Sequence, residues 1–304
     1  MAGAGAAGPD GLAVVDKEAG WTSHDVVAKA RGILHTRKVG HSGTLDPDAT
    51  GVLLLGVGRA TRLLRFLHDL PKRYVGEVVL GVETSTLDAA GEVVATHDMA
   101  AVTLDEARRA VIGLTGDILQ VPPMVSAVQI GGRRLHELAR QGIEVDRPAR
   151  PVTVHRFEVD ELPGEPGVLR IEVDCSSGTY VRSLAADLGR ALGGGAHLRN
   201  LRRTAVGRFT LADAHPLDDL VVLPMAEVVR DLAPVHVGDD LAAAVAHGKV
   251  LGRAELGLAP AAPASPADGP WAVFGPDGSL LAVYERHRGA TVKPAVVVAG
   301  QGDG

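Results

Sequence analysis

Two carboxylates and a histidine lie close together in residues 39–57, which read VGHSGTLDPDATGVLLLGV. His41, Asp46 and Asp48 are ligand types of a metal site, but they lack the spacing of a helical ligand pair, and no second His/Glu cluster lies nearby. The segment also lacks the Gly-Lys-Ser/Thr ending of a phosphate-binding loop. Three interpretations stay open: a metal site, which the spacing favours least, a structural turn at Asp46-Pro47, and a nucleophilic Asp46.

A nucleophilic aspartate needs a rigid loop that a substrate can approach closely. Gly40 and Gly43 leave room for the backbone to come near a substrate, and Pro47 fixes the chain direction directly after Asp46. A carboxylate in such a loop can form a covalent intermediate in glycosyl chemistry. It also needs an arginine that keeps it ionised and an aromatic side chain that packs on the substrate.

The elements that would position this loop predict an α+β fold with a mainly antiparallel or mixed sheet. Alternating hydrophobicity and turn residues predict strands just before residue 18 and over 72–82, 151–162 and 167–177. Helical periodicity and capping residues predict helices from Thr22 or Ser23 to 34, over 59–69 with one basic face, from Thr103 to 116, and over 179–195.

A change in composition near residue 235 predicts a small β-rich second domain over 237–304. Within it, residues 259–270 read as a low-complexity loop, and a hairpin over 271–289 turns at Pro276-Asp277-Gly278.

Composition indicates a globular protein with about two domains. The 304 residues are 46% hydrophobic and 22% charged, and no apolar run reaches the roughly 18 residues of a membrane helix. Residues 1–11 have neither the basic nor the apolar region of a signal peptide, so we expect a flexible tail and a cytoplasmic protein. Cys175 is the only cysteine, which excludes an internal disulfide and a multi-cysteine zinc site.

The charge distribution favours an anionic partner more than the net charge of −6 does. Segment 29–73 carries nine Lys and Arg against three Asp, and segment 182–208 carries six Arg against one Asp. From charge alone, these segments are either ordinary solvated faces or one electropositive face, and the motifs must decide between them.

KVGHSGTLDPDATGVL strongly resembles the catalytic motif of the TruB family of tRNA pseudouridine synthases. The resemblance spans about residues 12–215 in the family's order, through the blocks DKEAGWTSHDVV, GRATRLLRFL, KRYVGEVVLGVET, PPMVSAVQIGGRRLHELARQG, SSGTYVRSLAADLG and HLRNLRRTAVG. It implies a pseudouridine synthase fold, a mainly antiparallel mixed sheet flanked by helices, over 12–236. It also implies an RNA-clasping insertion over 124–150 and a PUA-like RNA-binding domain over 237–304.

The family's reaction converts a flipped-out uridine at position 55 of the tRNA T loop to pseudouridine. The resemblance implies that Asp46 is the nucleophile, attacking either the base or the ribose carbon. It also implies that no cofactor, metal or obligate protein partner is needed, and that the enzyme is a monomer. The expected partner is the T arm of tRNA.

The resemblance implies roles for six further side chains. Arg182 pairs with Asp46 and keeps it charged, and Tyr74 stacks on the uracil where a proton leaves C5. Four more residues are expected at the substrate: Tyr180 and Leu201 in the pocket, His41 in the space vacated by the flipped base, and Lys17 facing the site.

Four positions depart from the family pattern: Glu18, Ser85, Gln129 and His136 stand where proline, aspartate, lysine and tyrosine are common. None belongs to the catalytic set, but the last two fall in the RNA-clasping segment and put the tightness of RNA binding in doubt.

Two other functions stay open: an RNA-folding protein whose catalysis is lost, and a relative directed by guide RNA and partner proteins. The intact Asp46, Tyr74 and Arg182 argue against the first, and the 124–150 insertion argues against the second. If the two basic segments form one RNA face, reversing Arg202 or Arg203 to Glu should weaken RNA binding without disturbing the fold.

Overall fold

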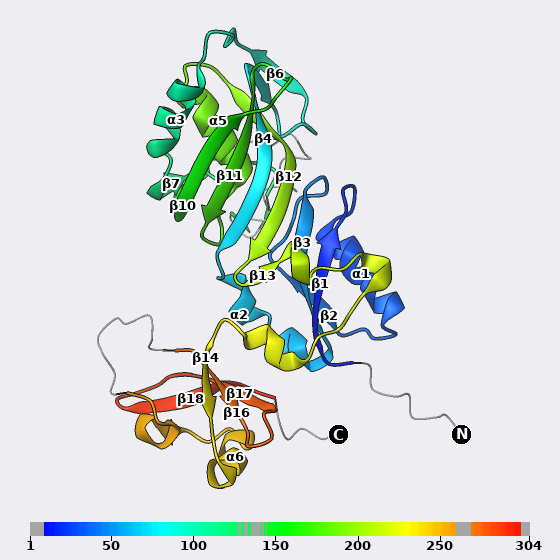
Figure 1. The fold of residues 1–304 in the computed structure, drawn as a ribbon, viewed down its shortest axis with the longest axis vertical. Coiled ribbons are helices and arrows are strands. Elements are labelled where there is room, and N and C mark those ends of the chain that lie inside the picture. Colours follow the sequence, from blue (N-terminus) through cyan, green and yellow to red (C-terminus); the bar gives the residue numbers. More distant parts are fainter. Residues whose placement is uncertain are drawn as a thin grey trace.

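The computed structural model describes residues 9–126, 129, 130, 133, 134, 141, 143, 145–259 and 269–298. Most of the predicted tail and of the 259–270 loop, together with part of the 124–150 insertion that includes His136, therefore lies outside the described residues. The molecule is elongated, with a large sheet and its helices above a small C-terminal module (Figure 1). No helix in the described part of the chain is long and apolar enough to cross a membrane.

One nine-stranded sheet organises the larger part. Its strands are β1 (Gly11–Lys17), β2 (Val39–Ser42), β3 (Thr50–Val57), β4 (Lys72–Leu80), β7 (Gly116–Gln120), β10 (Arg150–Glu161), β11 (Val168–Cys175), β12 (Ala196–Val206) and β13 (Phe209–Thr210). The order is β1-β3-β12-β4-β11-β10-β7, with β2 beside β3 and β13 beside β12. Only the β12–β3 pair is parallel, which confirms the predicted mixed, mainly antiparallel sheet.

Three helices flank this sheet where the sequence predicts them. They are α1 (Ser23–Ile33), α3 (Leu104–Ile112) and α5 (Val181–Ala191). Thr22 and Thr103 close capping boxes at the starts of α1 and α3, so both predicted N-caps are confirmed. In Figure 1, α3 and α5 lie together over the face formed by β10 and β11.

The predicted amphipathic helix over 59–69 was wrong in form. The segment is a 3₁₀ helix, η1 (Gly58–Leu63), followed by a short α2 (Arg65–His68). Leu64 joins them, and its side chain packs so closely on Gly40 and Gly56 that a Cβ at either glycine would lie about 3 Å from it. Tertiary packing of this leucine on two glycine-bearing strands overrides the local helical preference.

The C-terminal module is a five-stranded sheet in the order β14-β16-β17-β18-β15. Its elements are β14 (Ala233–His236), α6 (Asp239–Ala246), β15 (Leu251–Gly252), η5 (Arg253–Leu256), β16 (Trp271–Phe274), β17 (Leu280–Arg286) and β18 (Thr291–Val297). β16 and β17 form the predicted hairpin. Because β14 pairs with β16, the sheet begins at Ala233, slightly before the expected boundary at 237.

Short elements connect these parts. They are β5 (Val82–Thr84), β6 (Val93–Thr96), β8 (Gln129–Ile130), β9 (Arg133–Arg134), η2 (Leu211–Asp213), η3 (Leu217–Asp219) and η4 (Met225–Val229). One buried hydrophobic cluster runs from the large sheet through η1 and η4 into the C-terminal sheet; it includes Leu54, Leu63, Phe209, Val228 and Val283. A shared core of this kind fixes the module against the larger part.

Candidate active site

The loop between β2 and β3 carries Asp46 and is tied down from three directions. Ser23 of α1 hydrogen-bonds both the N–H and the carbonyl of Leu45, at 2.9 and 3.2 Å. Lys17 of β1 donates to the carbonyl of Pro47 at 2.8 Å, and Arg203 of β12 donates to that of Gly43 at 2.9 Å. Gly43 has a φ of +75°, a conformation that favours glycine. The loop is therefore rigid.

Arg182, the second residue of α5, grips Asp46 with two nitrogens. Its Nε lies 3.0 Å from Oδ2, and its Nη2 lies 3.2 Å from Oδ1. The arginine side chain is 4% exposed, whereas that of Asp46 is 43% exposed. Arg182 also contacts Asp88 at 3.3 Å and the carbonyls of Thr86 and Val125. A guanidinium held at this many points presents the carboxylate in one orientation.

Opposing effects set the pKa of Asp46. Burial raises it most, the positive charge of Arg182 lowers it, and the nearby Asp88 raises it again. The net shift is upward from the ordinary value. Arg182 therefore opposes the effect of burial and favours the charged form of this carboxylate.

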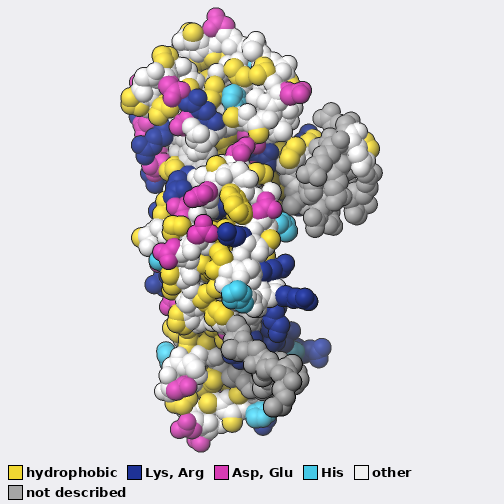
Figure 2. All heavy atoms as spheres, turned by 90° about the vertical axis from the view of Figure 1, so that its right-hand side faces the viewer, with side chains coloured by type: hydrophobic (Ala, Val, Ile, Leu, Met, Phe, Trp, Pro, Cys, Tyr) yellow, Lys and Arg dark blue, Asp and Glu magenta, His cyan; other side chains and the backbone are white. Residues whose placement is uncertain are grey.

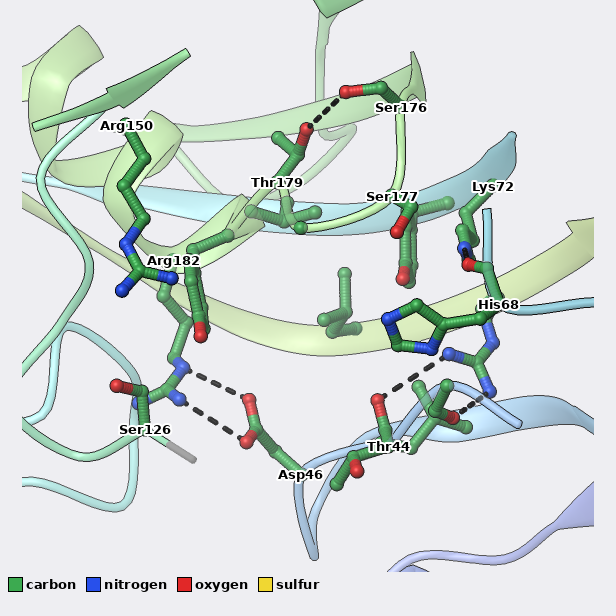
Figure 3. Close-up of a pocket in the computed structure, with 18 residues that line it drawn as sticks. Thr44, Asp46, His68, Lys72, Ser126, Arg150, Ser176, Ser177, Thr179 and Arg182 are labelled. Carbon is green, nitrogen blue, oxygen red and sulfur yellow. Dashed lines mark hydrogen bonds and ion pairs between the residues drawn. The ribbon is translucent and has the colours of Figure 1, made fainter. Parts of the chain in front are cut away.

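Asp46 opens into a pocket of 480 Å³, within the range of about 300–1,000 Å³ common for small-molecule sites. The pocket lies between the β2–β3 loop, β4, β12 and the start of α5 (Figure 3). Five of the seven residues expected at the substrate line it: Asp46, Tyr74, Tyr180, Arg182 and Leu201. The structure thus gathers a paired carboxylate, two tyrosines and a leucine, drawn from four parts of the sequence, around one cavity.

Comparison with known proteins shows the family. Residues 31–181 match the model of the TruB family pseudouridylate synthase N-terminal domain, and residues 182–231 match that of the tRNA pseudouridylate synthase B C-terminal domain. The tRNA pseudouridine synthase B of Arthrobacter sp. (strain FB24) is 48% identical over 299 residues, covering 95% of this chain and 96% of that protein. The chain belongs to the TruB family.

Other relatives agree with this assignment. The tRNA pseudouridine synthase B of Streptomyces coelicolor is 47% identical, covering 95% of this chain and 97% of that protein. Among solved structures, a Cbf5–Nop10–Gar1 complex contains a chain that matches with a TM-score of 0.71 and 28% identity, over 96% of this chain and 84% of that one. The pseudouridine synthase fold implied by the sequence is confirmed.

Two of the residues that the TruB resemblance placed at the substrate do not line the pocket. The ring of His41 packs edge-on against that of His24, with centroids 5.3 Å apart, and burial lowers its pKa to about 4. Lys17 is fully buried, its pKa lowered to about 8 by burial, and its ammonium donates to the carbonyls of Glu18, Trp21 and Pro47. Its contacts support the loop instead of reaching into the cavity.

Three residues of this TruB-family site were not singled out from the sequence as site residues. Asp88 shares Arg182 with Asp46, and Lys72 and Arg203 line the pocket together with Tyr74. Lys72 stands two residues before Tyr74, the spacing that places side chains on one face of a strand, and this was the available signal. The position of Asp88 depends on a contact 94 residues away in the sequence, and no local pattern marks it.

The expectation that Arg203 lies on an exposed RNA face was wrong. Arg203 is 1% exposed and donates to the carbonyls of Val52, Gly43 and Thr44. Its neighbour Arg202 pairs with Asp16 at 2.7 Å, and both side chains of that pair are 35% exposed. Arg203 therefore holds the Asp46 loop against β3 and β12, and a glutamate there would place a carboxylate among carbonyl oxygens.

Arg203→Met is expected to lower the free energy of unfolding by about 2–3 kcal/mol, because a buried carbonyl left without a donor costs roughly 1–3 kcal/mol and Arg203 bonds one buried carbonyl, of Val52, and two partly buried ones. Arg202→Met, which breaks a partly exposed ion pair, should cost at most about 1 kcal/mol. Urea denaturation followed by circular dichroism measures both. Equal losses in the two variants would contradict the structural role of Arg203.

Proposed function

We propose that this TruB-family protein isomerises uridine to pseudouridine at position 55 in the T loop of tRNA, with Asp46 as the nucleophile. The observation that carries the proposal is the two-point grip of Arg182 on Asp46 at the wall of a pocket lined by Tyr74 and Tyr180. The names of relatives that cover nearly the whole chain at 47–48% identity support the tRNA substrate.

The reaction gains and loses no atoms or electrons overall. The N1–C1′ bond breaks, the detached base turns, a C5–C1′ bond forms, and the proton from C5 is replaced by one on N1. Asp46 attacks either the base or the ribose carbon, and Arg182 keeps it charged until then. Tyr74 stacks on the uracil, with Leu201 on the same pocket wall. Burial raises the pKa of Tyr74, so it enters the reaction as a neutral phenol.

Tritium release from an unmodified tRNA transcript tests this function. When uridine carries tritium at C5, formation of the C5–C1′ bond must free that tritium to water. The purified protein alone should release one tritium for each T-loop uridine in the sample. No release would overturn the proposed function.

The same assay distinguishes an enzyme that acts alone from one that needs a guide RNA and partner proteins. The solved relatives include a Cbf5–Nop10–Gar1 complex and an H/ACA RNP bound to a substrate RNA, at 28% and 27% identity to this chain. We expect a monomer that needs no obligate protein partner and acts in the cytoplasm. Activity of the purified chain, with light scattering during gel filtration, tests the first two statements.

The domain assignment is part of the proposal. Residues 12–236 form the catalytic domain, and residues 237–304 form a PUA-like module that binds RNA. The small five-stranded sheet of the C-terminal module and its core shared with η1 and η4 support it. A module fixed in this way can add RNA contacts at a set distance from the pocket.

The RNA face is expected beside η1, at the open end of the β2–β3 hairpin, where β2 begins and β3 ends. Figure 2 shows Lys and Arg side chains gathered along one edge of the molecule. Arg37, Lys38 and Arg62 are exposed and, within the described ranges, pair with no carboxylate. Four other cations of segment 29–73 are already paired: Lys29, Arg59, Arg65 and Arg73 bind Asp218, Asp10, Glu285 and Asp174.

Reversing Arg37, Lys38 and Arg62 to Glu together should weaken tRNA binding and flatten its dependence on salt. Each lost phosphate contact should reduce the log–log slope by about 0.7–0.9, because fewer counterions are released. Arg109→Glu, a reversal of an exposed cation on α3, is the control and should leave the slope unchanged. Filter binding at a series of salt concentrations gives both slopes. Equal slopes in the triple variant and wild type would place the RNA elsewhere.

A further inference from the structure

At one end of the pocket, the positively charged side chains outnumber the carboxylates that could pair with them. The described residues that line the cavity include four cations, Lys72, Arg150, Arg182 and Arg203, but a single carboxylate, Asp46, which Arg182 already holds. Lys72 and Arg203 are 7% and 1% exposed. Neither pairs with a carboxylate in the part of the chain that the structure describes.

The groups that hydrogen-bond these two cations are neutral, and Asp69 acts on Lys72 through its charge without forming an ion pair with it. The ammonium of Lys72 donates to the carbonyl of His68, and Arg203 donates to three loop and strand carbonyls. Burial raises the pKa of the facing Cys175 thiol to about 11 and also raises that of Tyr74, so neither supplies negative charge near neutral pH. Buried cations are normally paired, because desolvation of an isolated charge is costly. An anion entering this end of the pocket would complete the pairing.

Uncommitted polar groups stand at the same end. Lys72 bonds the carbonyl of His68 and pairs across the sheet with Cys175, two residues before Ser177. Figure 3 shows Lys72, His68 and Ser177 on the opposite side of the view from Arg150 and Ser126. These five labelled residues line the cavity. Unlike its neighbour Ser176, which bonds Thr153 and Thr179, Ser177 has a hydroxyl with no hydrogen-bond partner among the described residues. An ammonium, an imidazole and a free hydroxyl are the donor types that hold a phosphate.

Gly43 keeps this end open. A Cβ at that position would lie 3.4 Å from Nη1 of Arg203 and 3.9 Å from Cε of Lys72, so any longer side chain would project toward the two cations. Arg203 and Lys72 therefore lie directly beside the backbone of the Asp46 loop. A group attached to a ribose at Asp46 can reach them without leaving the pocket.

We propose that Lys72, His68 and Ser177 form a subsite for one backbone phosphodiester of the RNA, a phosphate that flanks the uridine bound at Asp46. The inference rests on the proposed function, because the phosphate arrives attached to that nucleotide. Lys72 supplies the charge-assisted hydrogen bond, and Arg203 adds positive potential while it stays bound to its three carbonyls. The subsite holds the ribose in register with Asp46 while the base detaches and turns.

The test is a double-mutant cycle between protein and RNA. Two synthetic T-arm hairpins carry a neutral methylphosphonate in place of the phosphate on either the 5′ or the 3′ side of the target uridine. For one hairpin, kcat/KM of the wild type should fall about 10- to 100-fold, the equivalent of one charge-assisted hydrogen bond. On the native hairpin, kcat/KM of Lys72→Met should be lower than that of the wild type by a similar factor. Replacing the phosphate of that one hairpin by the methylphosphonate should then lower kcat/KM of Lys72→Met little further. Additive losses on both hairpins would overturn the subsite.

Controls separate the subsite from folding and from the reaction itself. Arg73→Met removes the neighbouring exposed cation of β4, which pairs with Asp174, and should behave as wild type on all three hairpins. Lys72→Arg keeps the charge and should keep sensitivity to the methylphosphonate. The melting temperature of Lys72→Met, followed by circular dichroism, reports a fold defect separately from activity. Additive losses in a variant that melts as the wild type overturn the subsite; if the variant melts lower, the loss of the wild type on one methylphosphonate hairpin still tests it. Failure of the wild type on native RNA would instead refute the proposed function.

Free phosphate is the other source of the same chemistry. If the subsite takes an independent anion, neither methylphosphonate should slow the wild type, and inorganic phosphate should raise the melting temperature of the wild type but not of Lys72→Met. That pair of results would overturn the RNA assignment.

Discussion

Asp46→Asn is expected to abolish pseudouridine formation while leaving tRNA binding intact. The amide has the shape of the carboxylate but cannot act as a nucleophile, and among the described residues no other carboxylate lines the pocket that holds Tyr74 and Tyr180. The rate should fall on the order of 10⁴-fold or more, the scale seen when a nucleophile is removed. Single-turnover tritium release measures the rate, and filter binding measures the affinity.

Asp48→Asn is the matched control for this variant. Asp48 lies on the same loop and is exposed; it lines a second hollow on the Asp88 side of Asp46, and not the pocket that holds Tyr74 and Tyr180. Its amide variant should retain activity within a few-fold of wild type. Appreciable turnover by Asp46→Asn, or an equal loss in Asp48→Asn, would remove Asp46 from the role of nucleophile.

Arg182→Met should have the second largest effect. It leaves Asp46 and Asp88 as neighbouring carboxylates without their shared cation. Removal of one partner of a buried pair costs roughly 3–5 kcal/mol, and because the Asp46 side chain is 43% exposed, solvent screening brings the expected cost to the lower end of that range. If most of that penalty appears in the reaction barrier, kcat should fall about 10²- to 10³-fold. Arg190→Met removes an exposed arginine of the same helix and should have little effect.

The pH dependence identifies the cause of this loss. Asp46 must be ionised to attack, and burial already raises its pKa, so wild-type activity should fall on acidification at a higher pH than an ordinary aspartate would give. Arg182 lowers that pKa, so its removal should shift the acid limb further upward. The deficit of Arg182→Met should therefore shrink as the pH rises. A deficit that is constant with pH would show that Arg182 acts only through geometry.

Local sequence patterns predicted most of the secondary structure because the signals were themselves local. The threonine caps of α1 and α3, the alternation of β4, β10 and β11, and the turn between β16 and β17 all lie within a few residues of the elements they define. The segment 58–68 could not be predicted in this way. Its form depends on Leu64 packing against two glycines of other strands.

The site residues also fall into two groups, those that a sequence motif identifies and those whose position depends on the fold. Motif resemblance selected Asp46, Tyr74, Tyr180, Arg182 and Leu201, and the structure gathers them around one pocket. It did not distinguish a buried arginine from an RNA-facing one, since Arg202 and Arg203 are adjacent and identical in type. Their difference arises from strand alternation: Arg203 points to the loop carbonyls, whereas Arg202 pairs with Asp16.

Position-specific mapping of pseudouridine in an unmodified tRNA transcript tests the central claim most directly. Carbodiimide modification followed by primer extension stops reverse transcription at each pseudouridine. After incubation with the wild type, we predict a single new stop at the T-loop uridine, position 55, and no stop after incubation with Asp46→Asn. A stop elsewhere, or the same stop with Asp46→Asn, would contradict the assignment of Asp46 as the nucleophile for this uridine.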